Sequence, residues 1–158
     1  MTTGSRLFHV GLCVADVERS LAFYRDIVGL RAGGIVGHRN PNFDDLSNNT
    51  GTIVRVAYLT NGLWTLQLIQ YVAAGGEPLA LSHSRPGCAH LSFYVDDADA
   101  KRAELVARGD VTITSQVVQL GPTMRSFYTV DPDGLPVEFL ELTGGATHGS
   151  VLADAGLV

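Results

Sequence analysis

Apolar and polar positions along the chain follow one order of elements twice. In the first half, the apolar run "LFHVGLCV" is typical of a short buried strand. The next stretch, "DVERSLAFYRDIVG", repeats apolar residues at helical spacing, with Asp16 placed to cap the helix and Gly29 to end it. The runs "TIVRVAYL" (52–59) and "LWTLQLIQY" (63–71) flank an Asn-Gly turn signal and predict a hairpin.

The second half repeats this series. "CAHLSFYV" predicts a strand, "DDADAKRAELVARG" a helix closed by Gly109, and "MRSFYTV" and "PVEFLEL" a hairpin around the turn "DPDG". One further strand is expected in each half, at 30–37 and at 111–121. The pattern therefore predicts an α+β fold of two tandem β-α-β-β-β modules.

The segments outside the strands and helices set the boundaries of the modules. We expect a first module at 6–71, a linker rich in Gly and Pro at 72–87, a second module at 88–142 and a C-terminal tail at 143–158, within one compact domain overall. The polar stretch 38–51, with Asn and Asp throughout, is predicted to be a loop and not a helix. Long loops can act as lids, but a plain surface loop fits equally well.

Composition narrows the class of protein. A net charge of −5 argues against nucleic acid as a partner, because phosphates need Lys and Arg patches. No apolar run reaches the roughly 20 residues that a membrane helix needs. Two cysteines are too few for a disulfide scaffold. We therefore expect a cytoplasmic protein that binds neither nucleic acid nor membrane.

The repeat places polar residues at equivalent positions. His90 stands where His9 stands, 81 residues later in the chain, and the hairpins superpose Glu138 on Gln67. Each residue alone has an ordinary explanation, since a strand His is often a hydrogen-bonded core residue. Four polar residues at symmetry-related strand positions are harder to explain, because an unpaired inward polar group is costly. Two imidazoles, one carboxylate and one amide oxygen instead favour a site for a divalent ion such as Mn, Co, Ni, Zn or Fe.

The motifs "FHVGLCVADVERSLAFYRDIVGL", "GCAHLSFYVDD" and "DPDGLPVEFLEL" resemble those of the vicinal oxygen chelate superfamily, which includes glyoxalase I, bleomycin-resistance proteins and extradiol dioxygenases. The resemblance spans about residues 6–142. It implies two modules whose sheets form curved half-barrels around one divalent metal ion, with ligands His9, Gln67, His90 and Glu138. This ligand set is most similar to that of the methylmalonyl-CoA epimerase branch.

Other residues carry roles that the resemblance implies. Glu138 is the candidate catalytic base, as ligand glutamates are in glyoxalase relatives. Epimerases place their base on the strand before Gln67, where this chain has Arg55. Arginine cannot act as a base, so we expect it to bind an anionic substrate, although a structural ion pair fits as well. On the equivalent strand, Ser126 and Tyr128 are expected to bind substrate.

Three functions compete. The favoured one is a metal-dependent isomerase or lyase, glyoxalase-like or epimerase-like, that stabilises an enolate of a small bidentate oxygen substrate. The alternatives are a small-molecule binding protein of the bleomycin-resistance type and an extradiol-type dioxygenase. The expected partner is a small, anionic substrate, and the resemblance implies a homodimer.

Overall fold

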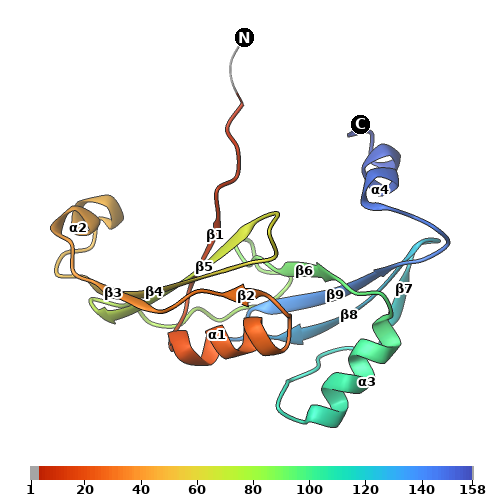
Figure 1. Cartoon of the computed structure of the whole chain (residues 1–158), viewed down its shortest axis with the longest axis horizontal. Helices are drawn as coiled ribbons and strands as arrows, with labels where there is room; N and C mark the ends of the chain where they lie inside the picture. Colours follow the sequence, from red (N-terminus) through yellow and green to blue (C-terminus); the bar gives the residue numbers. More distant parts are fainter. Residues whose placement is uncertain (1–3, 158) are drawn as a thin grey trace. The chain divides into compact units, whose positions relative to one another are not determined.

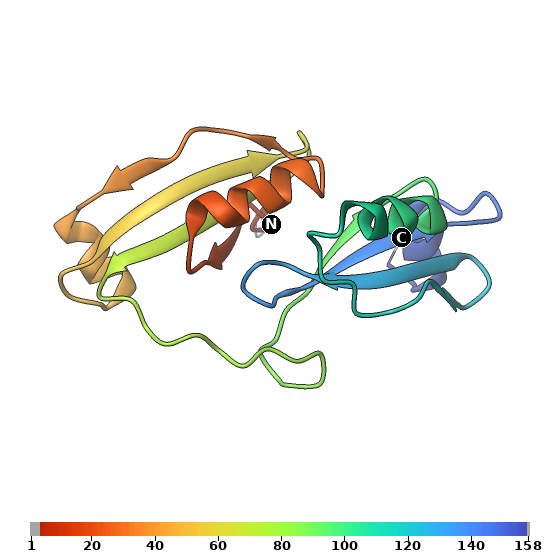
Figure 2. The ribbon, with the colours of Figure 1, turned by 90° about the horizontal axis from the view of Figure 1, so that it is seen from below.

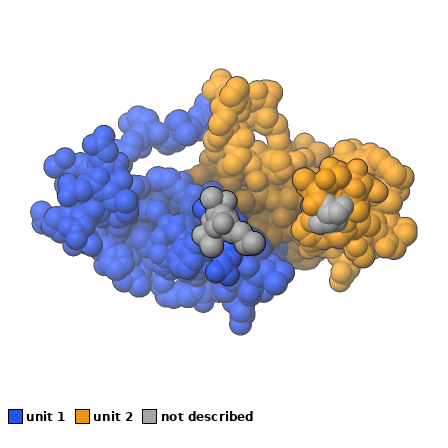
Figure 3. Space-filling view, turned by 90° about the horizontal axis from the view of Figure 1, so that it is seen from above, with its two compact units in different colours: residues 1–80 blue, residues 81–158 orange. Residues whose placement is uncertain are grey.

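A computed structural model of the chain describes residues 4–157. The chain forms two compact units, residues 1–80 and 81–158, coloured separately in Figure 3. Their boundary falls within the predicted linker 72–87. No helix in the described part of the chain is long and apolar enough to cross a membrane.

The first unit is a five-stranded sheet with one helix on a face. Strand β1 (Val10–Cys13) runs parallel to β5 (Thr65–Ala73), and β5 pairs antiparallel with β4 (Ile53–Thr60). The short strands β2 (Arg31–Ala32) and β3 (Val36–His38) both pair with β4. Helix α1 (Val17–Asp26) packs against β4 and β5 (Figure 1).

The second unit repeats the plan with four strands in the order β6-β9-β8-β7. Its helix α3 packs on β8 and β9, on one face of the sheet (Figure 2). A short helix, α4, follows in the C-terminal tail. The bounds of these elements are β6 (Leu91–Tyr94), α3 (Ala98–Arg108), β7 (Val118–Leu120), β8 (Met124–Val130), β9 (Pro136–Leu142) and α4 (His148–Asp154). The predicted α+β class with two repeated modules is confirmed.

Alternating side chains give each sheet two different faces. In β5, Leu66 and Leu68 are fully buried and face α1, whereas Gln67 between them faces the other way. In the second unit Phe127 and Phe139 stack with ring centroids 5.3 Å apart and are fully buried or nearly so. The helix-covered faces therefore hold the core, and polar residues can project from the opposite faces.

Each helix is fixed to its sheet at its N-terminus. The Asp16 side chain accepts a hydrogen bond from the Arg19 amide, and the Gln70 amide donates to the Ala15 carbonyl at 2.8 Å. Arg55 of β4 completes this anchor by a hydrogen bond of 2.8 Å from Nη1 to Glu18 Oε2 on α1. Unsatisfied amides at helix starts need such partners, so these contacts set where α1 begins.

The second unit carries an equivalent anchor. Asp97 caps α3, and the Glu141 carboxylate accepts a hydrogen bond from the Ala98 amide at 3.0 Å. Arg125 binds both Glu141, at 3.2 Å, and Asp99 of the helix. The repeat therefore conserves a way of holding the helix on the sheet.

Three predictions of local structure were wrong. The stretch 38–51 contains helix α2 (Pro41–Ser47), because Asn40 caps it, Pro41 suits its first turn and Asn48 ends it at φ 51°. The expected strand 30–37 is divided into β2 and β3. The expected strand 111–121 shortens to β7 with an isolated bridge between Ile113 and Thr129, which leaves most of it irregular.

Candidate functional site

The predicted metal ligands lie on the sheet faces that the helices leave uncovered. His9 and Gln67 belong to the first unit, and we call them the N-terminal pair. His90 and Glu138 belong to the second unit and form the C-terminal pair. Each pair joins the residue just before the first strand of a unit to a residue in the last strand, because those two strands run side by side and parallel.

The N-terminal pair surrounds a gap left by Gly11. A methyl group at that position would lie 3.6 Å from Gln67 Oε1 and 4.0 Å from a carbon of the His9 ring. The Gln67 amide nitrogen donates to the Tyr58 hydroxyl at 2.6 Å, so its oxygen is left free to accept. His9 Nδ1 is buried and has no hydrogen-bond partner among the described residues. Gln67 Oε1 thus keeps a lone pair available beside the Gly11 gap, and the His9 ring borders the gap with its Cδ2 edge.

In the C-terminal pair the His90 side chain is half exposed, whereas Glu138 is buried. Glu138 is only 6% exposed, and His90 Nε2 lies 4.0 Å from its Oε2. Within the described chain the carboxylate has no Arg or Lys partner and no hydrogen bond. Glu138 is therefore available to bind a cation or a donor from outside the chain.

The donor atoms of both pairs fit a divalent ion. Bonds of about 2.1 Å from one ion can span the 4.0 Å between His90 Nε2 and Glu138 Oε2. Imidazole, carboxylate and amide oxygen together suit borderline ions such as Zn, Ni, Co or Mn. Within residues 4–157 no three His, Cys, Asp or Glu side chains gather as a metal cluster, since each unit contributes one pair.

Tyr128 lies directly across from Glu138 in the β8–β9 ladder. Burial and the neighbouring Glu138 charge raise the pKa of the Tyr128 phenol, so the hydroxyl stays protonated and can donate. The Tyr128 ring also contacts two histidines edge-on, with centroid distances of 5.9 Å to His90 and 4.5 Å to His83. No sequence signal singled out His83, because it lies in an irregular segment before β6.

Ser126 lies two residues from Tyr128 in β8. Its side chain is 1% exposed, and its Oγ has no hydrogen-bond partner in the described structure. An unsatisfied buried hydroxyl costs roughly 1–3 kcal/mol. Such a cost is typical of a group that serves a ligand.

Arg55 lies on the helix-covered face of its sheet, and not on the face that carries Gln67. It pairs with Gln70 in the ladder and binds Glu18 on the helix-covered face. Counting back from Gln67 and Glu138 through the two hairpins aligns Arg55 with Ser126, but the first turn (61–64) is one residue shorter than the second (131–135). The true counterpart of Arg55 is Arg125, which makes the same helix contact. The ion-pair alternative is therefore what the structure shows, and Arg55 is not among the residues near the ligand pairs.

The same shift reveals a residue that the sequence analysis missed. Tyr58 pairs with Gln67 in the ladder as Tyr128 pairs with Glu138. The Tyr58 ring lies 6.4 Å from the His9 ring between centroids. Alignment of the two strands from their Arg and Tyr residues, rather than from the turns, finds it. A tyrosine therefore accompanies each ligand pair.

Comparisons with known proteins find relatives of one superfamily. A family model described as the glyoxalase/bleomycin resistance protein/dioxygenase superfamily matches residues 6–139. An uncharacterized protein of Escherichia coli, YaeR, is 29% identical over 86% of this chain and 95% of its own length. A lactoylglutathione lyase of Haemophilus influenzae is 28% identical over 86% of this chain and 92% of its own length.

Among solved structures, a glyoxalase family protein from Bacillus cereus aligns with a TM-score of 0.80. The alignment covers 91% of this chain and 99% of that one, at 17% identity, and thus supports the fold. Most of the chain is matched in sequence and in structure. The chain belongs to the glyoxalase/bleomycin resistance protein/dioxygenase superfamily.

Proposed function

We propose that the protein is a divalent-metal-dependent enzyme of the isomerase or lyase kind, with His9, Gln67, His90 and Glu138 as the ligands of one ion. A bound divalent ion would act as a Lewis acid on two adjacent oxygens of a substrate and stabilise an enolate. The four ligands include a single carboxylate, so a divalent centre would keep a charge of about +1. This charge favours an anionic substrate.

The observation that carries this proposal is the state of Glu138. The residue is 6% exposed, its carboxylate has no Lys or Arg partner in the described chain, and the His90 imidazole lies 4.0 Å away. A carboxylate beside an imidazole, with no other charged partner, is a donor pair suited to a divalent cation. A core packing role explains Glu138 poorly, because its equivalent position in the first unit, Gln67, also turns away from the core.

The other residues would handle substrate and protons. Glu138 is our candidate base for the substrate carbon, since among residues 4–157 no other carboxylate pairs with a predicted ligand. Tyr128 keeps its proton and donates a hydrogen bond to a substrate oxygen. Ser126, with its unpartnered hydroxyl, provides a second polar contact.

The subclass that we favour is glyoxalase-like. The Haemophilus influenzae relative is a lactoylglutathione lyase, which supports a hemithioacetal of an α-ketoaldehyde as the first substrate to test. The epimerase-like ligand set points to thioesters with an acidic α-proton as the second. Both classes present adjacent oxygens and require proton transfer at a carbon.

The test begins with metal content. Protein purified without a tag or chelator is analysed for metals beside His90→Ala and, as a control for an exposed histidine, His38→Ala. We expect about one Mn, Co, Ni, Zn or Fe per chain in wild type and in His38→Ala, and its loss in His90→Ala.

Activity is then measured on methylglyoxal hemithioacetals with and without a chelator. Activity that disappears with the chelator and returns with the ion supports the proposal. Stoichiometric iron with catechol cleavage would indicate the dioxygenase alternative. Failure of the wild-type protein to bind any of these ions would refute the proposed enzymatic function and would favour the alternative of a small-molecule binding protein.

A further inference from the structure

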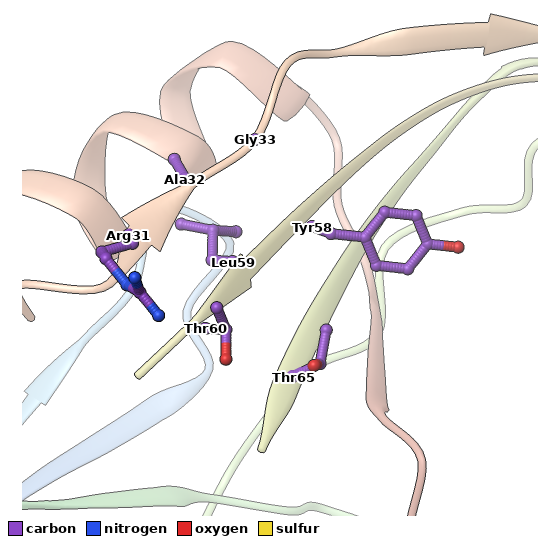
Figure 4. Close-up of a pocket in the computed structure, with 7 residues that line it drawn as sticks. All are labelled: Arg31, Ala32, Gly33, Tyr58, Leu59, Thr60 and Thr65. Carbon is purple, nitrogen blue, oxygen red and sulfur yellow. The ribbon is translucent and has the colours of Figure 1, made fainter. Parts of the chain in front are cut away.

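The first unit contains a pocket of about 440 Å³ (Figure 4), and one of its lining residues, Tyr58, also contacts both members of the N-terminal pair. Tyr58 and Thr60 of β4 line it, together with Thr65 of β5 and Arg31 of β2. Ladder partners place these side chains on one face. Arg31 pairs with Thr60, Thr60 with Thr65, and Tyr58 with Gln67. The pocket therefore opens on the face that carries Gln67, and Tyr58 belongs to both.

Arg31 is the charged group of this pocket. Of the described residues, none forms an ion pair or hydrogen bond with its guanidinium, in a chain with a net charge of −5. By contrast, Arg55, Arg125 and Arg108 are each paired with carboxylates. One guanidinium nitrogen of Arg31 lies 3.8 Å from where a side chain on Gly62 would begin, so the group lies over the hairpin turn.

The hydroxyl groups of the pocket differ in availability. Thr60 Oγ1 donates to the Trp64 carbonyl at 2.6 Å and accepts from the Gly62 amide at 2.9 Å, so the turn uses it fully. The Thr65 hydroxyl makes no hydrogen bond within the described chain. The pocket thus offers one planar guanidinium and one hydroxyl donor, with Leu59, Ala32 and Gly33 as further walls.

We propose that this pocket is a subsite for a carboxylate of the substrate, with Arg31 as the residue that binds it. The inference rests on the proposed function, in which the metal ion binds two oxygens at one end of the substrate. It adds the class of substrate: an organic acid whose carboxylate is separate from those two oxygens. A single guanidinium matches a planar carboxylate in a bidentate manner. A phosphate dianion would call for more donors than Arg31 and Thr65 supply.

The geometry sets the length of that substrate. Gln67 and Arg31 are two strands apart, about 10 Å, and Thr65 lies about 7 Å before Gln67 along β5. The Arg31 guanidinium lies over the hairpin turn, on the far side of Thr65 from Gln67, so its side chain does not shorten this distance. The carboxylate should therefore stand several bonds from the oxygens bound near Gln67, and α-hydroxy or α-keto acids are too short.

Binding can be tested without any reaction. The ¹⁵N-labelled full chain is titrated with 3-(methylthio)propionate and with its neutral amide, while the amide signals of Gly33, Gly62 and Thr65 are followed. We expect these signals to shift with the acid and not with the amide. Arg31→Met should weaken acid binding about tenfold to a hundredfold, since hydrogen bonds to charged groups are strong. Arg39→Met removes the same charge outside the pocket and should bind the acid as wild type does.

Three results would overturn the subsite: equal binding of acid and amide, unchanged acid binding by Arg31→Met, or tighter binding of inorganic phosphate than of the acid. Kinetics separate the subsite from the proposed function. With hemithioacetals of methylglyoxal, Arg31→Met should raise KM for the 3-mercaptopropionate adduct at constant kcat and leave the 2-mercaptoethanol adduct unchanged. Acid binding that depends on Arg31 in a protein without activity would support the subsite and refute the lyase.

Discussion

The hydrogen bond between Tyr58 and Gln67 leads to a quantitative prediction. An amide side chain can present either its oxygen or its nitrogen to a metal ion, and only the oxygen binds. In the structure Gln67 Nε2 donates to the Tyr58 hydroxyl at 2.6 Å, which keeps Oε1 on the side of the Gly11 gap. Tyr58→Phe removes the acceptor and keeps the ring.

The expected loss of metal affinity follows from exposure. Supporting residues around metal ligands commonly contribute ten- to a hundredfold in affinity. Tyr58 is 46% exposed, so water can replace its hydroxyl in part. A neutral hydrogen bond in such a setting contributes about 1 kcal/mol. We therefore expect Kd for the metal to rise about fivefold, below the range for buried supports.

The assay is a competition titration with a metal-binding dye, using the ion found in the purified protein. Tyr94→Phe is the matched control, because Tyr94 is an exposed tyrosine that contacts His148 instead of a predicted ligand. Both variants should unfold at the wild-type temperature. Wild-type affinity in Tyr58→Phe would refute the idea that Tyr58 orients Gln67. A loss above a hundredfold would mean that Tyr58 itself contacts the ion.

Three further predictions concern the same faces. Ser126→Ala should raise the free energy of unfolding by about 1 kcal/mol in a denaturant titration, because it removes an unsatisfied buried hydroxyl. The same variant should raise KM in steady-state kinetics, and an unchanged KM would exclude Ser126 from substrate binding. The phenol of Tyr128 should ionise at higher pH than exposed tyrosines. Its contribution to stability is complete below the ordinary pKa and is lost as pH rises above it; Glu138→Gln should lower the Tyr128 pKa in an absorbance titration, and no change would mean that burial alone sets it. Gly11→Ala should fold normally, since its methyl meets only ordinary contacts, but should weaken metal binding about tenfold by filling the gap, as the dye titration would show; wild-type affinity would mean that the gap is not where the ion binds.

The sequence predicted the repeated scaffold because the signals for it are local. Helix caps such as Asp16 and Asp97, the turn "DPDG" and the alternation around Gln67 act within a few residues. The repeat aligned His9 with His90 and Gln67 with Glu138, whereas the parallel strands that join His9 to Gln67 and His90 to Glu138 within each unit are seen in the structure. Helix α2 was missed since its capping residues, Asn40 and Asn48, also favour loops.

The error at Arg55 has a specific physical cause. Strand side chains alternate faces, so a shift of one residue transfers a side chain from one face to the other. The first hairpin turn is one residue shorter than the second, and the overlay from the far strands did not allow for this difference. Pairing between strands can be measured only in the structure. The observed pairing places Arg55 on the helix-covered face and Tyr58 beside Gln67.

The two units use the same contacts to hold a helix on one face of the sheet, and they differ in the residues on the opposite, uncovered face. Arg55 and Arg125 anchor α1 and α3 in the same way, and a tyrosine stands across from each predicted ligand in the last strands. On the uncovered faces the pairs diverge: the second unit has a buried carboxylate, Glu138, at the position where the first has a neutral amide, Gln67, and Ser92 stands at the position of Gly11. The carboxylate-binding Arg31 that we propose belongs to the first unit, where it pairs with Thr60; the counterpart of Thr60 in the second unit, Val130, has no pairing residue in β7. If both faces serve one substrate, the second unit supplies the charge that holds a cation and moves a proton, while the first recognises the rest of the molecule. Exchanging Gln67 and Glu138 by a double substitution should then keep metal binding, because the ligand set is unchanged, and lose turnover, because the carboxylate no longer lies beside Tyr128.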